Sequence, residues 1–212
     1  MTIEPSDRPL ERVPDAELGR RRTESEKPRR TQSEEPRRSE FELRRTARLL
    51  LRRPRVDDLD WMAALHADPL NYPHAPDRAH APAQARSLSQ SLLDAWEADR
   101  VGYWIVELLA AATDLPDPRI GMAGVRPSVL AGRTCFNLYF RFVVSVRGHG
   151  FAAEASREAL AVAALVDPGC PVVVRTRPAN GPARRLAEAL GMSRRADLDA
   201  ATSGYVVYVS DW

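Results

Sequence analysis

The stretch Asn137–Ala155, NLYFRFVVSVRGHGFAAEA, holds three structural signals in a fixed order. Apolar residues dominate its first part, which predicts a buried strand. Gly148 and Gly150 then flank a histidine and follow Arg147. Alanine-rich sequence next predicts a helix over 150–166. A strand, a glycine-rich turn and a helix in this order are typical of the first half of a β-α-β crossover.

The turn before this helix is suited to binding an anion. The first N–H groups of a helix have no partner within it and carry a partial positive charge. Glycines let the backbone approach a ligand closely, so a phosphate or a diphosphate is the ligand expected. The residues match neither the phosphate loop of nucleotide hydrolases nor the dinucleotide fingerprint. A purely structural tight turn explains the same glycines, so both interpretations stay open at this point.

The surrounding sequence predicts a mixed α/β fold. Strands are predicted at 46–52, 103–109, 120–125, 134–144, 171–176 and 205–210, with a further one around 194–198. Helices are predicted at 58–67 with Asp57 as N-cap, and at 84–98, 150–166 and 182–190. Residues 135–176 then form one right-handed crossover.

A change of composition near residue 44 separates a tail from a domain. Residues 1–44 contain 11 acidic and 11 basic residues, and SEKPRRT at 25–31 is echoed by SEEPRRS at 33–39. Such a segment cannot bury enough apolar surface to offset its ordering entropy. We predict a disordered charged tail over 1–44 and a domain over 45–212. A docking arm for RNA or an acidic partner is the functional alternative to a solvated tail.

The composition also limits the partners. Among 212 residues, 31 are Lys or Arg and 29 are Asp or Glu, and a net charge of +2 gives little attraction to nucleic acid. No membrane partner is expected, because no apolar run reaches the roughly 18 residues of a spanning helix and the N-terminus lacks a signal peptide. Cys135 and Cys170 are expected to be buried thiols of a cytoplasmic protein. A monomer or homodimer is expected, with Trp212 either packed on its own domain or at a dimer contact.

Several motifs together resemble one family. The spacing Arg147-x-x-Gly150-x-Ala152 is similar to the coenzyme A diphosphate loop of the GNAT superfamily of N-acetyltransferases, written Gln/Arg-x-x-Gly-x-Gly/Ala. Other segments resemble its RimJ/RimL-like branch of ribosomal-protein-alanine acetyltransferases, in the same order. They are TARLLLRRP at 46–54, GYWIVEL at 102–108, RIGMAGVRP at 119–127 and VVVRTRPANGPARRLAEALGM at 172–192. The resemblance extends from residue 45 to the C-terminus.

The resemblance implies the GNAT fold, with acetyl-CoA as co-substrate and no metal. The implied fold is a twisted, mixed and mostly antiparallel sheet of six to seven strands with four helices, splayed between the fourth and fifth strands. Acetyl-CoA would lie in that opening, its pantetheine arm paired with the backbone of Phe142, Val143 and Val144. The other implied contacts are Arg147, Gly148, His149, Gly150, Phe151 and Ala152 to the diphosphate, and Asn180 with Arg184 or Arg185 to the rest of the coenzyme.

The catalytic residues are less clearly marked. The resemblance implies direct attack by an amine, with a backbone N–H at the end of the fourth strand stabilising the oxyanion. Glu107, Tyr139 and Asn180 are the candidates for proton transfer, although a solvated carboxylate and a packed aromatic ring equally explain the first two. Relatives often carry Ser three residues after the asparagine, where this chain has Ala183. Glu154 is expected to complement the helix dipole.

The function predicted is therefore acetyl-CoA-dependent N-acetylation of a primary amine. A protein N-terminus, a small-molecule amine and an aminoglycoside-like antibiotic stay open as acceptors, and the mixed charge of loop 68–83 disfavours the polycationic antibiotic. A non-catalytic CoA-binding or scaffolding module of the same fold is the alternative. His66, His74 and His80 lack partners at metal-ligand spacing, so no metal site is predicted.

Overall fold

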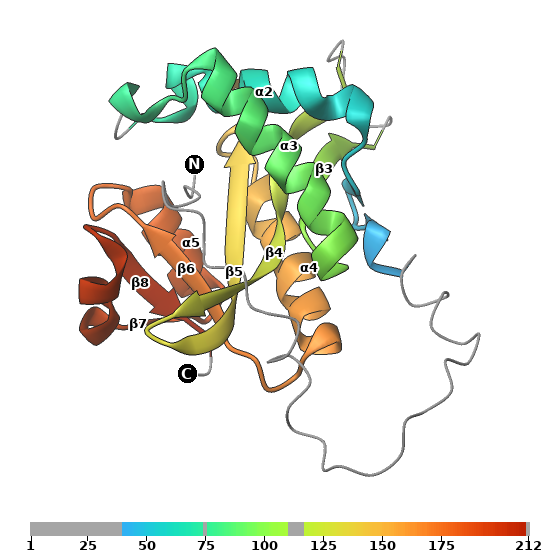
Figure 1. The fold of residues 1–212 in the computed structure, drawn as a ribbon. Helices are drawn as coiled ribbons and strands as arrows, with labels where there is room; N and C mark the ends of the chain where they lie inside the picture. Colours follow the sequence, from blue (N-terminus) through green and yellow to red (C-terminus); the bar gives the residue numbers. More distant parts are fainter. Residues whose placement is uncertain (1–39, 74–75, 110–116, 211–212) are drawn as a thin grey trace.

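The computed structural model describes residues 40–73, 76–109 and 117–210. These residues form one eight-stranded sheet in the order β1-β2-β3-β4-β5-β6-β8-β7 (Figure 1). All neighbouring strands are antiparallel except β5 and β6, which are parallel. The predicted mixed and mostly antiparallel architecture is confirmed. Most of the predicted tail, up to residue 39, and the residues His74 and Trp212 lie outside the described residues.

The sheet has more strands than the sequence indicated. The strands are β1 Leu43–Arg45, β2 Leu49–Arg52, β3 Tyr103–Leu108, β4 Arg119–Leu130, β5 Arg133–Phe142, β6 Val172–Thr176, β7 Ser193–Arg194 and β8 Val206–Val209. The additional strand is β1, whose three residues are too few to show a two-residue periodicity. The prediction of a strand around 194–198 is wrong beyond Arg194, because Ala196–Thr202 forms a 3₁₀ helix.

The four predicted helices correspond to four helices of the structure. They are α2 Leu59–Ala67, α3 Pro82–Asp99, α4 Phe151–Val166 and α5 Gly181–Ala189. The predicted cap of the first helix is wrong by one residue, because a 3₁₀ turn at Val56–Asp58 makes Asp58 the N-cap in place of Asp57. The Asp58 carboxylate accepts the backbone N–H of Arg55 at 2.8 Å, which holds that turn.

Helices cover both faces of the sheet (Figure 1). Met62 of α2 and Leu92 of α3 pack in one hydrophobic cluster with Tyr139 of β5. Ala155 of α4 packs in a second cluster, with Phe140 of β5, on the opposite face. The side chains of β5 therefore alternate between a face covered by α2 and α3 and a face covered by α4 and α5.

The parallel pairing of β5 with β6 is short, and this opens the sheet. Registered pairs are limited to Phe136 with Val172 and Asn137 with Val173, although β5 continues to Phe142. The connection between the two strands is α4, as the predicted crossover requires. The predicted splay between the corresponding strands is thus present, and it lies directly before the glycine-rich turn.

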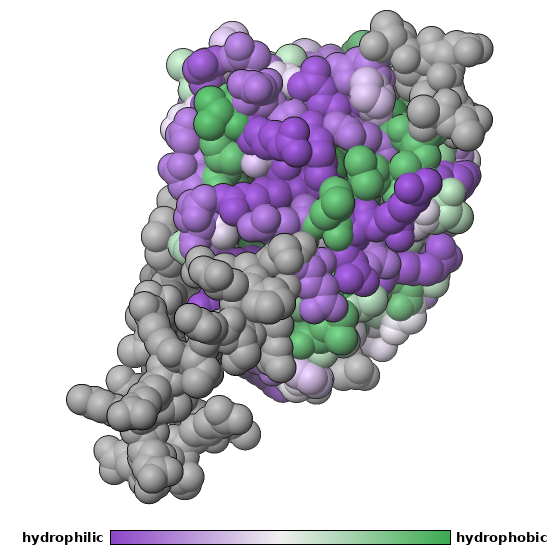
Figure 2. Space-filling view, turned by 90° about the vertical axis from the view of Figure 1, so that its right-hand side faces the viewer, coloured by the Kyte–Doolittle hydropathy of each residue, from purple (hydrophilic) through white to green (hydrophobic). Residues whose placement is uncertain are grey.

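The surface shown in Figure 2 is mostly hydrophilic, and its apolar residues form separate groups. Among the helices in the described part of the chain, none is long and apolar enough to cross a membrane.

Candidate functional site

The backbone of β5 faces the opening of the sheet with unused hydrogen-bonding directions. Phe136 donates its N–H to the carbonyl of Pro171, beside β6, at 2.8 Å. Because alternate residues of a strand direct their N–H groups to the same side, those of Phe140 and Phe142 also point towards β6. Val143 is different, since its N–H donates to the carbonyl of Ile120 in β4 at 3.0 Å.

The glycine-rich turn leads from β5 into α4 in a conformation that favours glycine. Gly148 has φ +85° and Gly150 has φ +81°, both in the left-handed region. An added Cβ at Gly148 would meet only open space. Within the described residues, no backbone hydrogen bond is donated by the amides of 148–153. A run of available N–H groups at a helix start is an anion-binding arrangement.

Arg48 holds this turn from outside. Its Nη1 donates to the carbonyl of His149 at 3.0 Å, and its guanidinium lies 4.5 Å from the ring centroid of Phe151. Glu154 on the first turn of α4 accepts from Arg48 Nε at 2.7 Å and from Thr46 Oγ1 at 2.5 Å. Glu154 therefore ties α4 to the β1–β2 turn, so its role goes beyond the predicted dipole interaction.

His149 is exposed, and its ring stacks on Phe151 at a centroid distance of 5.9 Å. Its Nδ1 lies 3.2 Å from the carbonyl oxygen of Val146 and 3.1 Å from that of Arg147. Carbonyl oxygens only accept, so Nδ1 carries the proton in this arrangement.

A cavity of about 570 Å³ lies over the turn at the open end of the sheet. It is lined by Pro73, Phe142, Val146, Arg147, Gly148, Gly150, Phe151, Ala152, Ala153 and Pro182. The cavity joins the end of β5, the glycine turn, the start of α4 and the start of α5. Six of the predicted coenzyme contacts line it, namely Phe142, Arg147, Gly148, Gly150, Phe151 and Ala152.

Asn180 and Arg184, two further predicted coenzyme contacts, differ in their position relative to the cavity. Asn180, 6% exposed, is the N-cap of α5, and its Oδ1 accepts the N–H of Ala183 at 3.3 Å, next to Pro182 of the cavity. Arg184 is engaged elsewhere, because it donates to the Tyr208 hydroxyl at 3.1 Å and to the Pro178 carbonyl at 3.2 Å. Asn180 thus stays near the cavity, and Arg184 is directed away from it.

Comparison with known proteins identifies this arrangement. Residues 48–193 match the acetyltransferase (GNAT) domain family. The chain belongs to this family. No curated protein matches the sequence, although many solved structures match the fold.

Three of these structures show the range of the likeness. An acetyltransferase from Agrobacterium tumefaciens has a TM-score of 0.65 and 19% identity, over 80% of this chain and 94% of that one. The ribosomal-protein-S5-alanine acetyltransferase from Vibrio fischeri has a TM-score of 0.58 and 15% identity, over 80% and 98%. RimL, a ribosomal L7/L12 α-N-protein acetyltransferase in complex with coenzyme A, has a TM-score of 0.56 and 11% identity, over 78% and 94%.

In this acetyltransferase domain, Tyr139 lies under α2 and does not line the cavity. Its hydroxyl is 3.0 Å from Nε2 of His66 and accepts from Nε of Arg141 at 2.9 Å. The other ring nitrogen of His66 is 2.7 Å from the carbonyl of Met62, so that nitrogen carries the proton and Tyr139 donates to Nε2. Burial, and then the charge of Arg141, lower the pKa of His66 to about 3, so the imidazole is neutral.

Two arginines meet between this cluster and the cavity. Arg141 is 0% exposed, and its guanidinium lies 3.9 Å from the ring centroid of Tyr72. Its Nη1 is 3.5 Å from the carbonyl of Asn71, whose side-chain oxygen accepts from Nη2 of Arg147 at 3.0 Å. Burial and the neighbouring Arg141 lower the pKa of Arg147.

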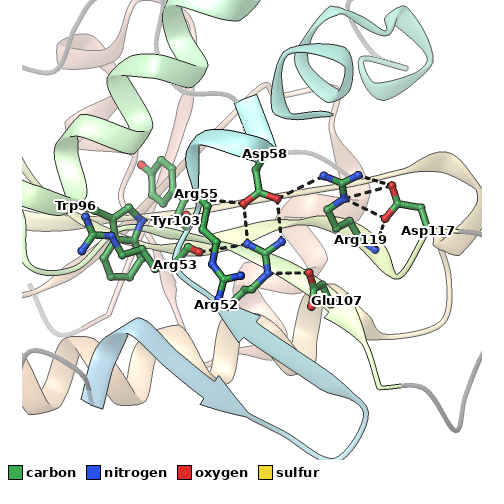
Figure 3. Close-up of polar contacts among 9 residues, drawn as sticks. All are labelled: Arg52, Arg53, Arg55, Asp58, Trp96, Tyr103, Glu107, Asp117 and Arg119. Atoms are coloured by element: carbon green, nitrogen blue, oxygen red, sulfur yellow. Dashed lines mark hydrogen bonds and ion pairs between the residues drawn. The ribbon is translucent and has the colours of Figure 1, made fainter. Parts of the chain in front are cut away.

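Glu107 lies in a different cluster on the same face of the sheet. Its carboxylate accepts from Nε of Arg52 at 2.7 Å, and Arg52 also forms a double hydrogen bond with Asp58 at 2.6 and 2.8 Å. Figure 3 shows Asp58 between the guanidinium groups of Arg52 and Arg119, and Arg119 also pairs with Asp117. Glu107 is therefore held in an ion-pair network that joins α2 to the sheet, and it does not line the cavity.

Sequence reasoning missed Arg48, Asn71 and Arg141. The arginine at 141 carried a signal, since it stands among the aromatic residues of a predicted strand. Arg48 and Asn71 carried none, because their roles depend on partners about 100 and 76 residues away along the chain.

Proposed function

We propose that this chain transfers an acetyl group from acetyl-CoA to a primary amine, on a protein N-terminus or on a small molecule. The observation that carries the proposal is the cavity at the open end of β5 and β6, which joins the glycine turn to the start of α4. A cytoplasmic location and a monomer or homodimer are part of the proposal. Cys135 and Cys170 form no disulfide, which favours that location.

The residues around the cavity fit a coenzyme that carries a diphosphate. The amides of 148–152 would hold the diphosphate, and the backbone of Phe142 would pair with the pantetheine arm. Val143 is a weaker candidate for that pairing, because its N–H is already bonded within the sheet. Asn180 would contact the coenzyme through its side-chain amide while its oxygen caps α5. Acetyl-CoA, when bound, supplies the activated acetyl group as a thioester.

Catalysis in this arrangement would rest mainly on positioning. The N–H of Phe142 faces the opening and is the candidate for stabilising the oxyanion. Glu107 is held by Arg52 in an ion pair. Tyr139 donates a hydrogen bond to His66, whose pKa of about 3 means that this histidine does not readily accept a proton from Tyr139. Neither is a ready base at neutral pH. We therefore expect kcat/KM to rise with pH until the amine itself is neutral.

Isothermal titration with acetyl-CoA tests the proposal. Gly150→Asp places a carboxylate at the helix start, so we expect the affinity to fall by at least about a hundredfold through charge repulsion. Gly132→Asp is the matched control, because Gly132 has φ +75° and open space around it in the β4–β5 turn. It should bind acetyl-CoA like the unaltered protein. Equal acetyl-CoA affinity of the two variants would mean that the glycine turn only connects β5 to α4 and does not bind the coenzyme.

An amine panel then separates catalysis from binding alone. Transfer to at least one peptide or small amine, followed by release of free coenzyme A, supports the enzyme. The alternative is a non-catalytic CoA-binding or scaffolding module, which Ala183 in place of a hydroxyl residue favours. Tight coenzyme binding without transfer to any amine would support that alternative.

A further inference from the structure

Arg141 is a buried charge without a counter-charge. Its side chain is 0% exposed, and its Nη2 has no hydrogen-bond partner. Among the described residues, no carboxylate lies within ion-pair distance of its guanidinium. Its contacts are a phenol, a backbone carbonyl and the ring of Tyr72. Burying a cation in this way is unfavourable unless a further partner compensates it.

Arg147 adds a second cation at the same place. Its Nε is buried and has no partner, and it shares Asn71 with Arg141. Asp68 accepts from Nδ2 of Asn71 at 3.4 Å and its charge raises the pKa of Arg147 against the lowering by burial, but it forms no ion pair with either arginine. Arg147 also lines the cavity, beside Pro73, whereas Arg141 is not among the lining residues and is joined to Arg147 through Asn71.

Three other arginines on this face of the sheet have carboxylate partners, whereas a fourth, Arg175, has none among the described residues and lies 3.4 Å from Oδ1 of Asn137. Arg52 and Arg119 share Asp58, and Arg126 pairs with Asp99 at 3.5 Å. Arg141 and Arg147 differ from Arg175 because two cations that form no ion pair within the described part of the chain share Asn71, and one of them, Arg147, lines the cavity. A guanidinium binds a carboxylate with two parallel hydrogen bonds, which Arg141 and Arg147 both have donors to make.

We propose that Arg141 and Arg147 bind a carboxylate of the acceptor. The acceptor is then an amine with a carboxylate a few bonds from its nitrogen, either a free amino acid or a peptide with an acidic residue next to its N-terminus. The same charges repel a polycation, which argues against an aminoglycoside acceptor. This inference rests on the proposed function, because it assigns the substrate class of that same site.

Matched acceptors test it. The measured quantity is kcat/KM for acetyl transfer. In the first pair alanine is compared with alaninamide, and in the second the amide of Ala-Asp is compared with the amide of Ala-Asn. We expect the acid to be preferred by about tenfold or more in one pair, equivalent to about 1.4 kcal/mol. Preference in the first pair identifies a free amino acid, and preference in the second identifies an acidic peptide. Equal rates or a preference for the amide in both pairs would overturn the proposal.

Variants separate the carboxylate contact from the effect of a carboxylate on the basicity of the amine. Arg141→Gln and Arg147→Gln should each reduce the acid-to-amide ratio by about tenfold. Arg147 is less buried than Arg141, and the GNAT loop pattern allows Gln as well as Arg at its position. Arg147→Gln therefore serves as the test if Arg141→Gln fails to fold. Arg126→Gln is the control, because it removes an arginine that already has Asp99. A ratio that falls equally in the control contradicts the assignment.

A binding measurement distinguishes this proposal from the proposed function. N-acetylalanine and its amide are titrated into the protein saturated with coenzyme A. The N-acetylated amides of Ala-Asp and Ala-Asn are titrated in the same way. Tighter binding of an acidic product, lost in Arg147→Gln, supports the carboxylate subsite even if turnover is slow. Equal affinity for acid and amide overturns the subsite while leaving the acetyltransferase intact. Absence of coenzyme binding itself would be a failure of the proposed function.

Discussion

Two clusters of charge lie on the same face of the sheet, and they differ in how their arginines are compensated. In the first, Arg52 and Arg119 meet Asp58, and Arg52 also meets Glu107 (Figure 3). In the second, Arg141 meets neutral groups only, among them Tyr139. The first lies where α2 begins and joins it to β2, β3 and β4. The second lies at the C-terminal end of α2, where Tyr139 contacts His66, and Asn71 joins it to Arg147 of the cavity.

The difference separates structure from binding. A neutralised network satisfies every charge within the protein, so it can hold α2 in place without a ligand. An uncompensated buried cation lowers stability, and a ligand that supplies the counter-charge would offset this cost. On this basis we propose that the cluster that contains Glu107 is structural and that the cluster that contains Tyr139 and Arg141 lies on the acceptor side of the site.

The largest effect is expected in the neutralised cluster. Asp58→Asn leaves Arg52 without its main partner at a position where the aspartate side chain is only 4% exposed. We expect the free energy of unfolding to fall by about 3–5 kcal/mol in urea denaturation. Asp60→Asn is the control, because Asp60 pairs with Arg86 on the surface and should change stability by less than about 1 kcal/mol. Similar losses in both variants would contradict the assigned difference.

Asp58 also predicts an acid dependence. Burial raises its pKa, but the hydrogen bonds from Arg52 and from the backbone of Arg55 outweigh burial, so the pKa is lowered overall. Because the folded pKa lies below the unfolded one, this stabilisation is complete above about pH 3.9 and is lost as the pH falls through the folded value. Asp58→Asn should flatten the unfolding free energy in that acid range. A profile parallel to the unaltered protein would show that Asp58 is not the titrating group.

A second pH dependence comes from the uncompensated cluster. His66 has a folded pKa of about 3, so it is neutral when folded and takes up a proton on unfolding below about pH 6.5. Stability should therefore be complete above pH 6.5 and decline towards pH 3, by up to about 1.4 kcal/mol per pH unit. His66→Gln should remove this slope, and the exposed His149→Gln should keep it. The same slope in both variants would place the titration elsewhere.

The smallest expected effect concerns Glu107. Glu107→Gln removes one charge from a network in which Arg52 keeps Asp58, so we expect a stability loss of about 1 kcal/mol and unchanged acetyl-CoA affinity. Acetyl transfer at saturating substrate should change less than about threefold. A loss of turnover by orders of magnitude with intact stability would make Glu107 the catalytic base and break the division between the two clusters.

Local patterns were sufficient for most elements of the fold. The alternating and apolar runs located the central strands, and the four helices appeared within a few residues of their predicted bounds. The edge strand β1 and the three-residue 3₁₀ turns escaped, because three residues carry no measurable period, and β7 was predicted too long. The glycine turn was readable from sequence, since a left-handed backbone conformation favours glycine wherever it occurs.

The sequence by itself determined the glycine turn at 148–150, the crossover around it and thereby the family, because these depend on neighbours along the chain. Only the tertiary structure decided which charges are compensated. Glu107 and Arg141 look alike in the sequence, as single charges in apolar strands. One meets Arg52, which is 55 residues away, and the other meets no carboxylate among the described residues. The electrostatic role of a buried charge depends on its partners in space, and a linear pattern does not contain them.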